Sequence, residues 1–314
     1  MAPQPRIHTM LQLKQLMMRM WVLILLIVTT VNGVHVHQQD DALYKALRTS
    51  IKGQVFAKGT YAYEAHRLVH NGGCRHIYPA YVVRPESTED VSAIVKVATE
   101  WGVPLSVRSG GHSYQCTGTK HGSINVDMRS MRTVELVSSH EAILGAGNVW
   151  GQVLDVIKPE YYTMVHGQCL MVGVGGFLLG LGTNLPGTSS RFGSGADHVL
   201  EHTMVLADGS VAKVTEHNTT LLRGHHPPEV IPHGYDNDLR FALRTAGSSY
   251  GITTEFRYKI YPRPETLPFL IPVFIEGPED FRALERVAAS GRYSALIVEG
   301  YYFRRPALVH VVSL

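Results

Sequence analysis

Val107-Arg108-Ser109-Gly110-Gly111-His112-Ser113-Tyr114 is the stretch that decides the fold. A short apolar run, residues 103–107, precedes it and predicts a buried strand. The paired glycines let the backbone turn sharply and bring its N–H groups close to a ligand. Such N–H groups, with Arg108 beside them, suit phosphate oxygens, and His112 stands at the end of the turn. Taken alone, the stretch fits a surface turn with an incidental histidine equally well.

A second glycine-rich stretch, residues 167–182, changes that balance. It contains Gly167-Gln168-Cys169-Leu170-Met171-Val172-Gly173-Val174-Gly175-Gly176. Few of these residues have side chains that fill a core, which favours close approach of the backbone to a large flat ligand. The alternative is a flexible linker, but the interspersed apolar residues disfavour it because solvated linkers are polar. The spacing of the glycines does not match a dinucleotide fingerprint, and no phosphate loop ending in Gly-Lys-Ser/Thr is present.

Composition and charge limit the possible function classes. The 314 residues are enough for one large or two ordinary domains. Residues 1–33 carry three basic and no acidic residues, so removing them takes the formal charge from +3 to 0. A basic nucleic-acid-binding surface therefore has no support from net charge. A basic leader, an apolar run from Met20 to Val31 and a small-residue ending at Gly33 predict a signal peptide and secretion, with an uncleaved anchor as the alternative.

A secretory route makes cysteines candidates for disulfides. The chain has three, Cys74, Cys116 and Cys169, so one thiol is left over. Asn218-Thr219-Thr220 is a candidate glycosylation sequon, expected on an exposed loop within residues 217–236. Paired histidines elsewhere lack partners at metal-site spacing, so no metal is predicted.

Helices and strands are predicted in an alternating order, which favours a mixed sheet covered by helices. The predicted helices are 40–53, 87–101, 150–157, 238–244 and 278–289. The predicted strands are 77–83, 103–107, 124–128, 133–137, 142–146, 252–260, 269–275, 295–302 and 308–312, together with a hairpin over 199–215 that turns at Asp208-Gly209.

Both glycine stretches and their flanks resemble the berberine-bridge-enzyme-like FAD-linked oxidases, which have an FAD-binding fold of the vanillyl alcohol oxidase/p-cresol methylhydroxylase (PCMH) type. The resemblance runs from about Tyr78 to Tyr261. It includes Gly145-Ala146-Gly147-Asn148-Val149-Trp150-Gly151, Asp197-His198-Val199, Ala207-Asp208-Gly209 and Gly251-Ile252-Thr253-Thr254-Glu255-Phe256, in the family's order. It implies an α+β chain with a PCMH-type FAD-binding domain of two α/β subdomains, followed by the start of an α+β substrate domain.

The resemblance also implies site residues. Arg108 to Ser113 resemble the loop that holds the FAD pyrophosphate, and His112 the histidine joined to the flavin 8α-methyl. Cys169 resembles the cysteine joined to flavin C6, which leaves Cys74 and Cys116 as a disulfide candidate. The residues implied to bind FAD are Arg108, Ser109, Gly110, Gly111, His112, Ser113, Cys169, Val172, Gly173, Gly175, Gly176, Gly251 and Ile252. Val172 stands where the family's oxygen gate lies; the catalytic base is not assigned.

The chain also departs from the family. Leu179-Gly180-Leu181-Gly182 stands where the family often has three glycines, and Thr245-Ala246-Gly247-Ser248-Ser249-Tyr250 where it often has a glycine run. Larger side chains there are expected to crowd the flavin. The predicted organisation is a signal peptide (1–33), an N-terminal helical segment (34–76), the FAD-binding domain (77–262) and a partial substrate domain (263–314).

The expected function is that of a secreted oxidase with doubly attached FAD. Hydride would pass from an alcohol, sugar or amine-type C–H of a small-molecule substrate to flavin N5, and O2 would accept the electrons to give H2O2. Two alternatives stay open: a truncated flavin-binding paralogue without catalysis, and a dehydrogenase that uses another acceptor. No nucleic-acid partner and, after signal cleavage, no membrane contact are expected; the sequence leaves the substrate and oligomeric state undecided.

Overall fold

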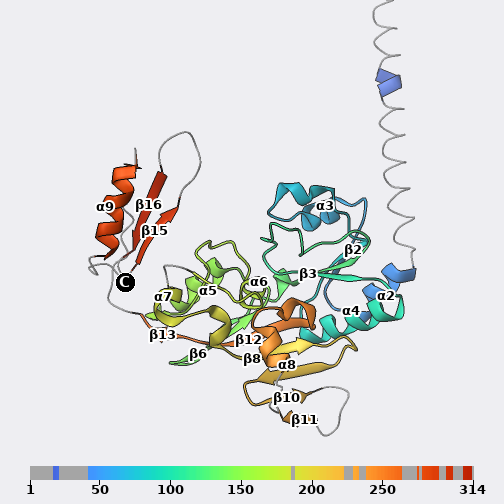
Figure 1. The fold of residues 1–314 in the computed structure, drawn as a ribbon. Helices are drawn as coiled ribbons and strands as arrows, with labels where there is room; N and C mark the ends of the chain where they lie inside the picture. Colours follow the sequence, from blue (N-terminus) through green and yellow to red (C-terminus); the bar gives the residue numbers. More distant parts are fainter. Residues whose placement is uncertain are drawn as a thin grey trace, which may run out of the picture.

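The computed structural model describes residues 17–20, 42–184, 188–222, 229–232, 238–263, 274–275, 278–289, 295–299 and 307–312. Two large sheets organise this part of the chain (Figure 1). The first contains β1 (Gln54–Ala57), β2 (Tyr81–Arg84), β4 (Ile124–Asp127) and β3 (Leu105–Arg108), in that spatial order. Its strands β2 and β3 lie parallel to β4, while β1 lies antiparallel to β2. The central strand β4 is buried along its whole length.

The second sheet is antiparallel and has seven strands. In spatial order they are β11 (Glu229–Pro232), β10 (Asn218–Leu221), β9 (Val211–Thr215), β8 (Val199–Val205), β12 (Ile252–Lys259), β6 (Glu141–Gly145) and β5 (Val134–Ser138). Together with the helices, the two sheets confirm the predicted α+β class. The hairpin predicted over 199–215 is confirmed as β8 and β9, and its turn places Gly209 at φ +82°.

Helix α4 (Thr88–Glu100) packs against the second sheet through β8 and β12. Its N-terminus forms where the sequence predicts it, because the Ser87 side chain accepts a hydrogen bond from the Asp90 N–H. Val91, Ile94 and Ala98 are buried, as their spacing on one helix face requires. Figure 1 shows α4 between the two sheets, so its apolar face helps to hold the two subdomains together.

Helix α5 (Trp150–Ile157) is also confirmed, with the predicted bounds. Trp150 is completely buried, and its ring meets Phe177 edge-on at 5.1 Å and Tyr258 at 6.5 Å. Phe177 belongs to α6 (Val174–Leu178), inside the second glycine-rich stretch, and Tyr258 belongs to β12. The indole therefore packs the glycine-rich stretch onto the second sheet.

One expectation about organisation is extended and another is wrong. Residues 34–76 were expected to form an N-terminal helical segment; their described part contains the helices Ala42–Ser50 and Tyr61–Arg67, and also β1, which adds a strand to the first sheet by pairing with β2. Residues 217–236 were expected to be an exposed loop, but β10 and β11 extend the second sheet. The sequon therefore lies on β10, where Asn218 is partly buried and Thr219 is buried. The polar composition of β10 concealed a strand that pairs on both sides, with β9 and with β11.

The remaining elements are short or lie near the chain's end. They are α2 (Ala42–Ser50), α3 (Tyr61–Arg67), α7 (Thr188–Phe192), α8 (Asp238–Leu243), the 3-10 helices Gly72–His76, Met128–Ser130, Gly195–His198 and Gly247–Ser249, the pair β7 (Tyr162–Thr163) and β13 (Tyr261–Pro262), and then β14 (Phe274–Ile275), α9 (Pro278–Ala289), β15 (Ala295–Glu299) and β16 (Ala307–Val312). The last three strands form their own antiparallel sheet. Apart from residues 17–20, the predicted signal peptide lies outside the described residues. No described helix is long and apolar enough to cross a membrane.

A buried histidine makes the stability of this fold depend on pH. His202 on β8 is 1% exposed, its ring packs edge-on against Phe256, and neither ring nitrogen has a hydrogen-bond partner within the described part of the chain. Burial, and secondly the charge of Arg240, lower its pKa from 6.5 to about 3. Below pH 6.5 the unfolded chain therefore binds a proton at His202 that the folded chain excludes. The contribution of neutral His202 to the free energy of unfolding is fully present above pH 6.5 and is lost as pH falls toward 3.

We expect His202→Leu to weaken this pH dependence. Between pH 7 and pH 5 the wild-type chain loses about 2 kcal/mol of unfolding free energy through this group, and the variant does not. Urea unfolding at the two pH values measures the difference. His217→Leu, at an exposed histidine, is the matched control and retains the wild-type dependence. Equal pH dependence in wild type and His202→Leu would contradict the assignment.

Candidate functional site

The loop that follows β3 turns at its two glycines, as the sequence predicts. Gly111 adopts φ +75°, a conformation that side chains rarely take. The Gly111 carbonyl accepts a hydrogen bond from the His70 N–H at 3.0 Å, which fixes the turn against the segment after α3. One expectation about the preceding strand is wrong: β3 is an edge strand, and Val107 is 37% exposed. Leu105 and Val107 line a cavity, and Leu105 also packs against the core.

The two glycine-rich stretches lie directly against each other. A Cβ added to Gly110 would be 2.5 Å from the Gly173 nitrogen, and one added to Gly173 would be 2.1 Å from the Gly110 nitrogen. Ser109 joins the stretches by hydrogen bonds, donating to the Ala146 carbonyl at 2.6 Å and accepting from the Gly175 N–H at 3.2 Å. Backbone packing between the two loops therefore requires glycine at positions 110 and 173, whether or not a ligand is bound.

This contact brings His112 and Cys169 together. The His112 Nε2 lies 3.8 Å from the Cys169 Sγ, although the residues are 57 positions apart in sequence. Cys169 is an exposed free thiol, while His112 is partly buried. Burial, and then the nearby His70 imidazole, lower the pKa of His112. A neutral imidazole with an available lone pair beside a thiol is a pair of nucleophiles aimed at one small region.

The Arg108 side chain does not take part in the phosphate seat expected for it. Its guanidinium is buried, donating to the Asp127 carboxylate at 2.6 Å and to the Leu68 carbonyl at 2.7 Å. Burial alone would raise the pKa of Asp127, but the hydrogen bonds and charges of Arg129 and Arg108 outweigh it and lower the pKa. The positive charge is thus used to anchor the end of β3. Backbone N–H groups are left as the loop's means of holding an anion.

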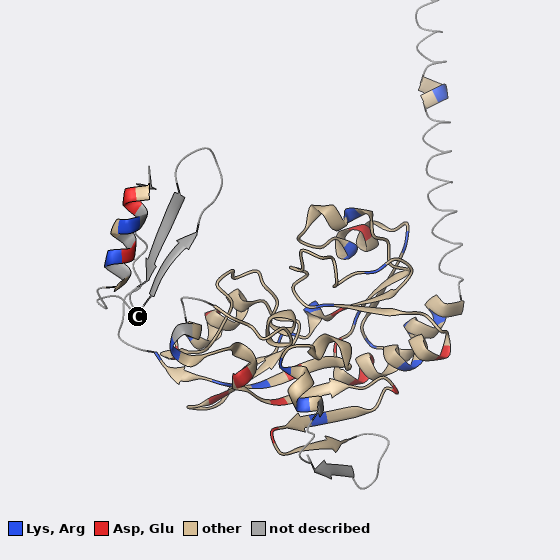
Figure 2. Cartoon of the chain, in the orientation of Figure 1, with Lys and Arg blue, Asp and Glu red and all other residues tan. Residues whose placement is uncertain are grey.

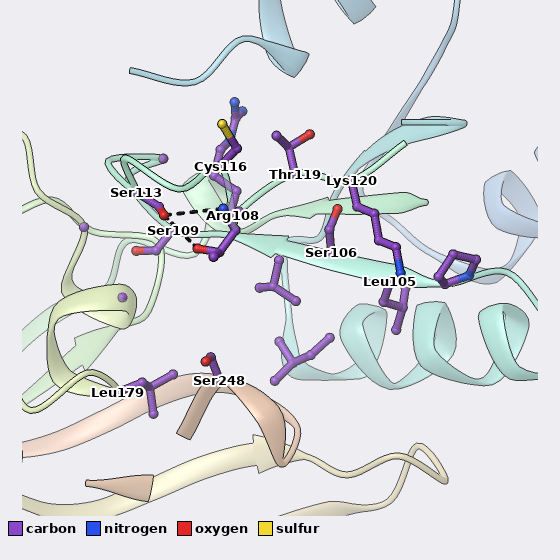
Figure 3. Close-up of a pocket in the computed structure, with 18 of the residues that line it drawn as sticks. Leu105, Ser106, Arg108, Ser109, Ser113, Cys116, Thr119, Lys120, Leu179 and Ser248 are labelled. Atoms are coloured by element: carbon purple, nitrogen blue, oxygen red, sulfur yellow. Dashed lines mark hydrogen bonds between the residues drawn. The ribbon is translucent and has the colours of Figure 1, made fainter. Parts of the chain in front are cut away.

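A cavity of about 1580 Å³ opens beside the two loops (Figure 3). Figure 3 shows Ser109 and Ser113 on one side of it and Leu179 and Ser248 on the opposite side. The volume exceeds the range of about 300–1,000 Å³ that is usual for small-ligand sites, so the cavity admits an extended ligand. No charged residue occurs between Ser109 and Thr119, and Figure 2 shows basic and acidic residues interspersed along the described chain.

Most of the predicted site residues line this cavity, with two exceptions. The lining residues among them are Arg108, Ser109, Gly110, Gly111, His112, Ser113, Val172, Gly173, Gly176, Gly251 and Ile252. Cys169 lies beside His112 outside this lining, and Gly175 packs beneath Ser109. Gly176 has no atom within 4 Å of an added Cβ, so it is the glycine that leaves space for a ligand.

Side chains from both departures from the family pattern line the cavity, namely Leu179, Thr245 and Ser248. The Leu179 side chain also packs against Gly247, where an added Cβ would lie 2.6 Å from Leu179 Cδ2. Crowding of a bound flavin by these side chains stays a prediction. Gly251 is held at φ +148° against the Val205 carbonyl and turns the chain into β12 along the cavity wall.

Sequence reasoning missed two parts of the site. Val205, Leu206 and Ala207, at the end of β8, line the cavity, and the predicted hairpin turn was the available signal. The segment after α3 was missed entirely: the His70 ring stacks on the His112 ring with centroids 3.8 Å apart. The predicted disulfide is present, since Cys74 is bonded to Cys116. It ties the same segment to the loop that carries His112.

Comparison with known proteins points to one cofactor. Residues 79–215 match the family described as an FAD binding domain. An FAD-dependent monooxygenase of Fusarium proliferatum is 35% identical over 185 residues, which cover 58% of this chain and 32% of that protein. A glucooligosaccharide oxidase of Sarocladium strictum is 30% identical over 192 residues, covering 60% and 35%. The chain thus spans about a third of the length of these curated relatives.

A solved structure supports the same conclusion. The Physcomitrella patens berberine-bridge-enzyme-like protein 1 superposes with a TM-score of 0.59 at 29% identity, covering 70% of this chain and 44% of that one. The PCMH-type fold expected from the sequence is confirmed. Both glycine-rich stretches lie within the residues that match the FAD binding domain family.

Replacing glycines at 110 and 176 tests the two roles assigned to glycine here. We expect Gly110→Ala to lower the unfolding free energy by about 2 kcal/mol or more, because its methyl group meets backbone that cannot move aside. Gly176→Ala, inside α6 and open to the cavity, should leave stability unchanged or raise it by about 0.5–1 kcal/mol. Urea unfolding at pH 7 measures both. The assignment fails if the two variants have the same stability.

Proposed function

We propose that the chain carries an FAD-binding domain of the type found in berberine-bridge-enzyme-like FAD-linked oxidases, and that it is an FAD-dependent oxidase whose flavin is attached through both His112 and Cys169. The observation that carries the proposal is the 3.8 Å separation between His112 Nε2 and Cys169 Sγ, next to a cavity lined by both glycine stretches. Neither side chain belongs to the buried core, since Cys169 is exposed and His112 is only partly buried.

The separation of the two nucleophiles suits attachment to one ring. The flavin 8α-methyl and C6 are substituent positions on the same benzenoid ring, one ring atom apart, so residues bonded to both must lie within a few ångströms of each other. A histidine and a cysteine 57 positions apart in sequence meet this condition because Gly110 packs on Gly173. The bound flavin would supply a hydride acceptor, whose electronics two such substituents alter.

The chain's own groups would have distinct roles around the cofactor. Backbone N–H groups of residues 109–113 would hold the pyrophosphate, because the Arg108 guanidinium is engaged with Asp127. Gly176 would admit the flat ring, and Leu105 and Val107 would cover apolar parts of the ligand. Gly251 and Ile252 would close the cavity wall at the start of β12.

The proposed reaction is hydride transfer from an alcohol, sugar or amine-type C–H of a small-molecule substrate to flavin N5, with O2 as acceptor and H2O2 as product. The name of the Sarocladium strictum relative, a glucooligosaccharide oxidase, favours a sugar among these classes. The chain spans about a third of that relative, so the substrate class and the electron acceptor are part of the proposal.

Secretion is part of the proposal. Its support is the layout of residues 1–33 and the Cys74–Cys116 disulfide, which is typical of proteins from oxidising compartments. N-terminal sequencing of chain exported by an expressing host checks the cleavage site predicted after Gly33. Glycosylation at Asn218 belongs to the same proposal, and the mass lost on deglycosylation checks it.

Acid precipitation tests the attachment. The wild-type chain should give a yellow pellet, because covalent flavin stays with denatured protein. Cys169→Ala and His112→Ala should each retain colour through the remaining bond, and the double variant should release all flavin into the supernatant. His140→Ala, at an exposed histidine, is the control and gives a yellow pellet. A colourless wild-type pellet refutes the covalent proposal.

Replacing Val172 tests the proposed use of oxygen. Val172 is partly buried and lines the cavity, and its N–H donates to the Cys169 carbonyl at 3.1 Å. Val172→Ile should slow reoxidation of reduced flavin by O2 about tenfold, equivalent to about 1.4 kcal/mol in the barrier, while Val172→Ala keeps the wild-type rate. Stopped-flow mixing of reduced protein with O2 measures both. Slow wild-type reoxidation by O2 with fast reoxidation by a dye would favour the dehydrogenase alternative.

A further inference from the structure

The segment after α3 follows the loop that carries His112 over its whole length. The Leu68 carbonyl accepts from Arg108, the His70 N–H donates to the Gly111 carbonyl at 3.0 Å, and the Asn71 amide donates to the Tyr114 carbonyl at 2.8 Å. Cys74 is bonded to Cys116 at the far end. Four links in register, one of them covalent, make the two stretches a single unit. The segment is therefore placed to control where the loop's side chains point.

Within this unit, one contact involves side chains at the proposed attachment point. The imidazoles of His70 and His112 are stacked, with ring centroids 3.8 Å apart and an angle of 17° between their planes. The His112 Nε2 edge faces the Cys169 Sγ at 3.8 Å. The His112 ring thus has one face covered by His70 and one edge next to the thiol. Tilting the ring out of this plane would break the stack, so the stack holds the plane of the His112 ring.

We infer that His70 is a positioning residue for flavin attachment, which orients the His112 imidazole by stacking on it. This inference rests on the proposed function, because it concerns the bond between His112 and the flavin. His70 itself forms no bond to the cofactor. The role requires a planar ring at position 70 that lies parallel to the His112 ring. The hydrogen bond from the His70 N–H to the Gly111 carbonyl fixes the backbone of His70 in the position that the stack needs.

Orientation matters because attachment is a reaction between fixed groups. Forming the link replaces one C–H bond of the 8α-methyl and one imidazole N–H bond by a C–N bond. The two protons and two electrons released would pass to the isoalloxazine ring, and O2, the acceptor proposed above, would remove them as H2O2. Such a step is fast only if the nitrogen lone pair points at the carbon, and small misplacements of a reacting group cost large factors in rate.

The test measures attachment itself and not turnover. The Cys169→Ala chain serves as parent, so that only the bond to His112 is detected. It is produced in a host starved of riboflavin and then mixed with FAD. Intact-mass spectrometry follows the fraction of chain that gains the mass of FAD, and flavin fluorescence gives the dissociation constant before attachment. His70→Ala, His70→Phe and His76→Ala are compared with this parent; His76 is an exposed histidine of the same segment.

We expect His70→Ala to slow attachment about tenfold or more without weakening the initial binding of FAD. His70→Phe restores a flat ring and should keep close to the parental rate, as should His76→Ala. The inference is overturned if His70→Ala matches the parent, if His70→Phe is as slow as His70→Ala, or if slow attachment follows only from weaker FAD binding. A parent that gains no FAD overturns the proposed linkage, and this inference with it; a parent that is labelled together with unaffected variants overturns this inference alone.

Discussion

The site depends on the contact between two glycines, Gly110 and Gly173, whose backbones approach so closely that neither position has space for a Cβ. Each glycine stands in a loop from a different part of the chain, and Ser109 reinforces the contact by bonding to both Ala146 and Gly175. Backbone packing of this kind leaves little freedom for the loops to slide. The thiol and imidazole that meet at 3.8 Å are therefore held there by main chain and not by their own attraction.

The buried carboxylate of Asp127 is a second contact that holds the end of β3 in place, in addition to the packing of Gly110 on Gly173. Arg108 and Arg129 both bond to it, and the positive charge that a reader of the sequence would assign to a ligand is neutralised inside the protein. A buried carboxylate without such partners would be strongly unfavourable, so these residues depend on one another. The consequence for the site is that its loop faces the cavity with N–H groups and small side chains, which suit an anion through many weak contacts instead of one strong charge.

Local patterns made much of this fold predictable, and tertiary contacts explain what was not. Ser87, followed by acidic residues and an apolar stripe, identified α4, and Asp208-Gly209 identified the hairpin. Each of these signals is contained within a short stretch of sequence. Strands β1 and β10 were missed, since four residues with mixed polarity carry little pattern of their own and form only by pairing with a neighbour. The resemblance implied that both glycine stretches bind one cofactor, but neither the contact of Gly110 with Gly173 nor the stacking of His70 had a motif to reveal it.

Val107 shows why apolar residues near a binding cavity mislead sequence reasoning. Its hydrophobicity predicts burial, yet it and Leu105 line the open cavity, while Ser106 and Arg108 point inward and are buried. An apolar side chain that will be covered by a ligand obeys the same transfer energetics as one covered by protein, so the pattern cannot separate the two. Under the proposed function, this surface would hold the cofactor before any bond forms. Attachment through His112 and Cys169 would then act on a ligand already in place, which is why the orientation of the imidazole, and not the affinity of the cavity, would limit the rate of attachment.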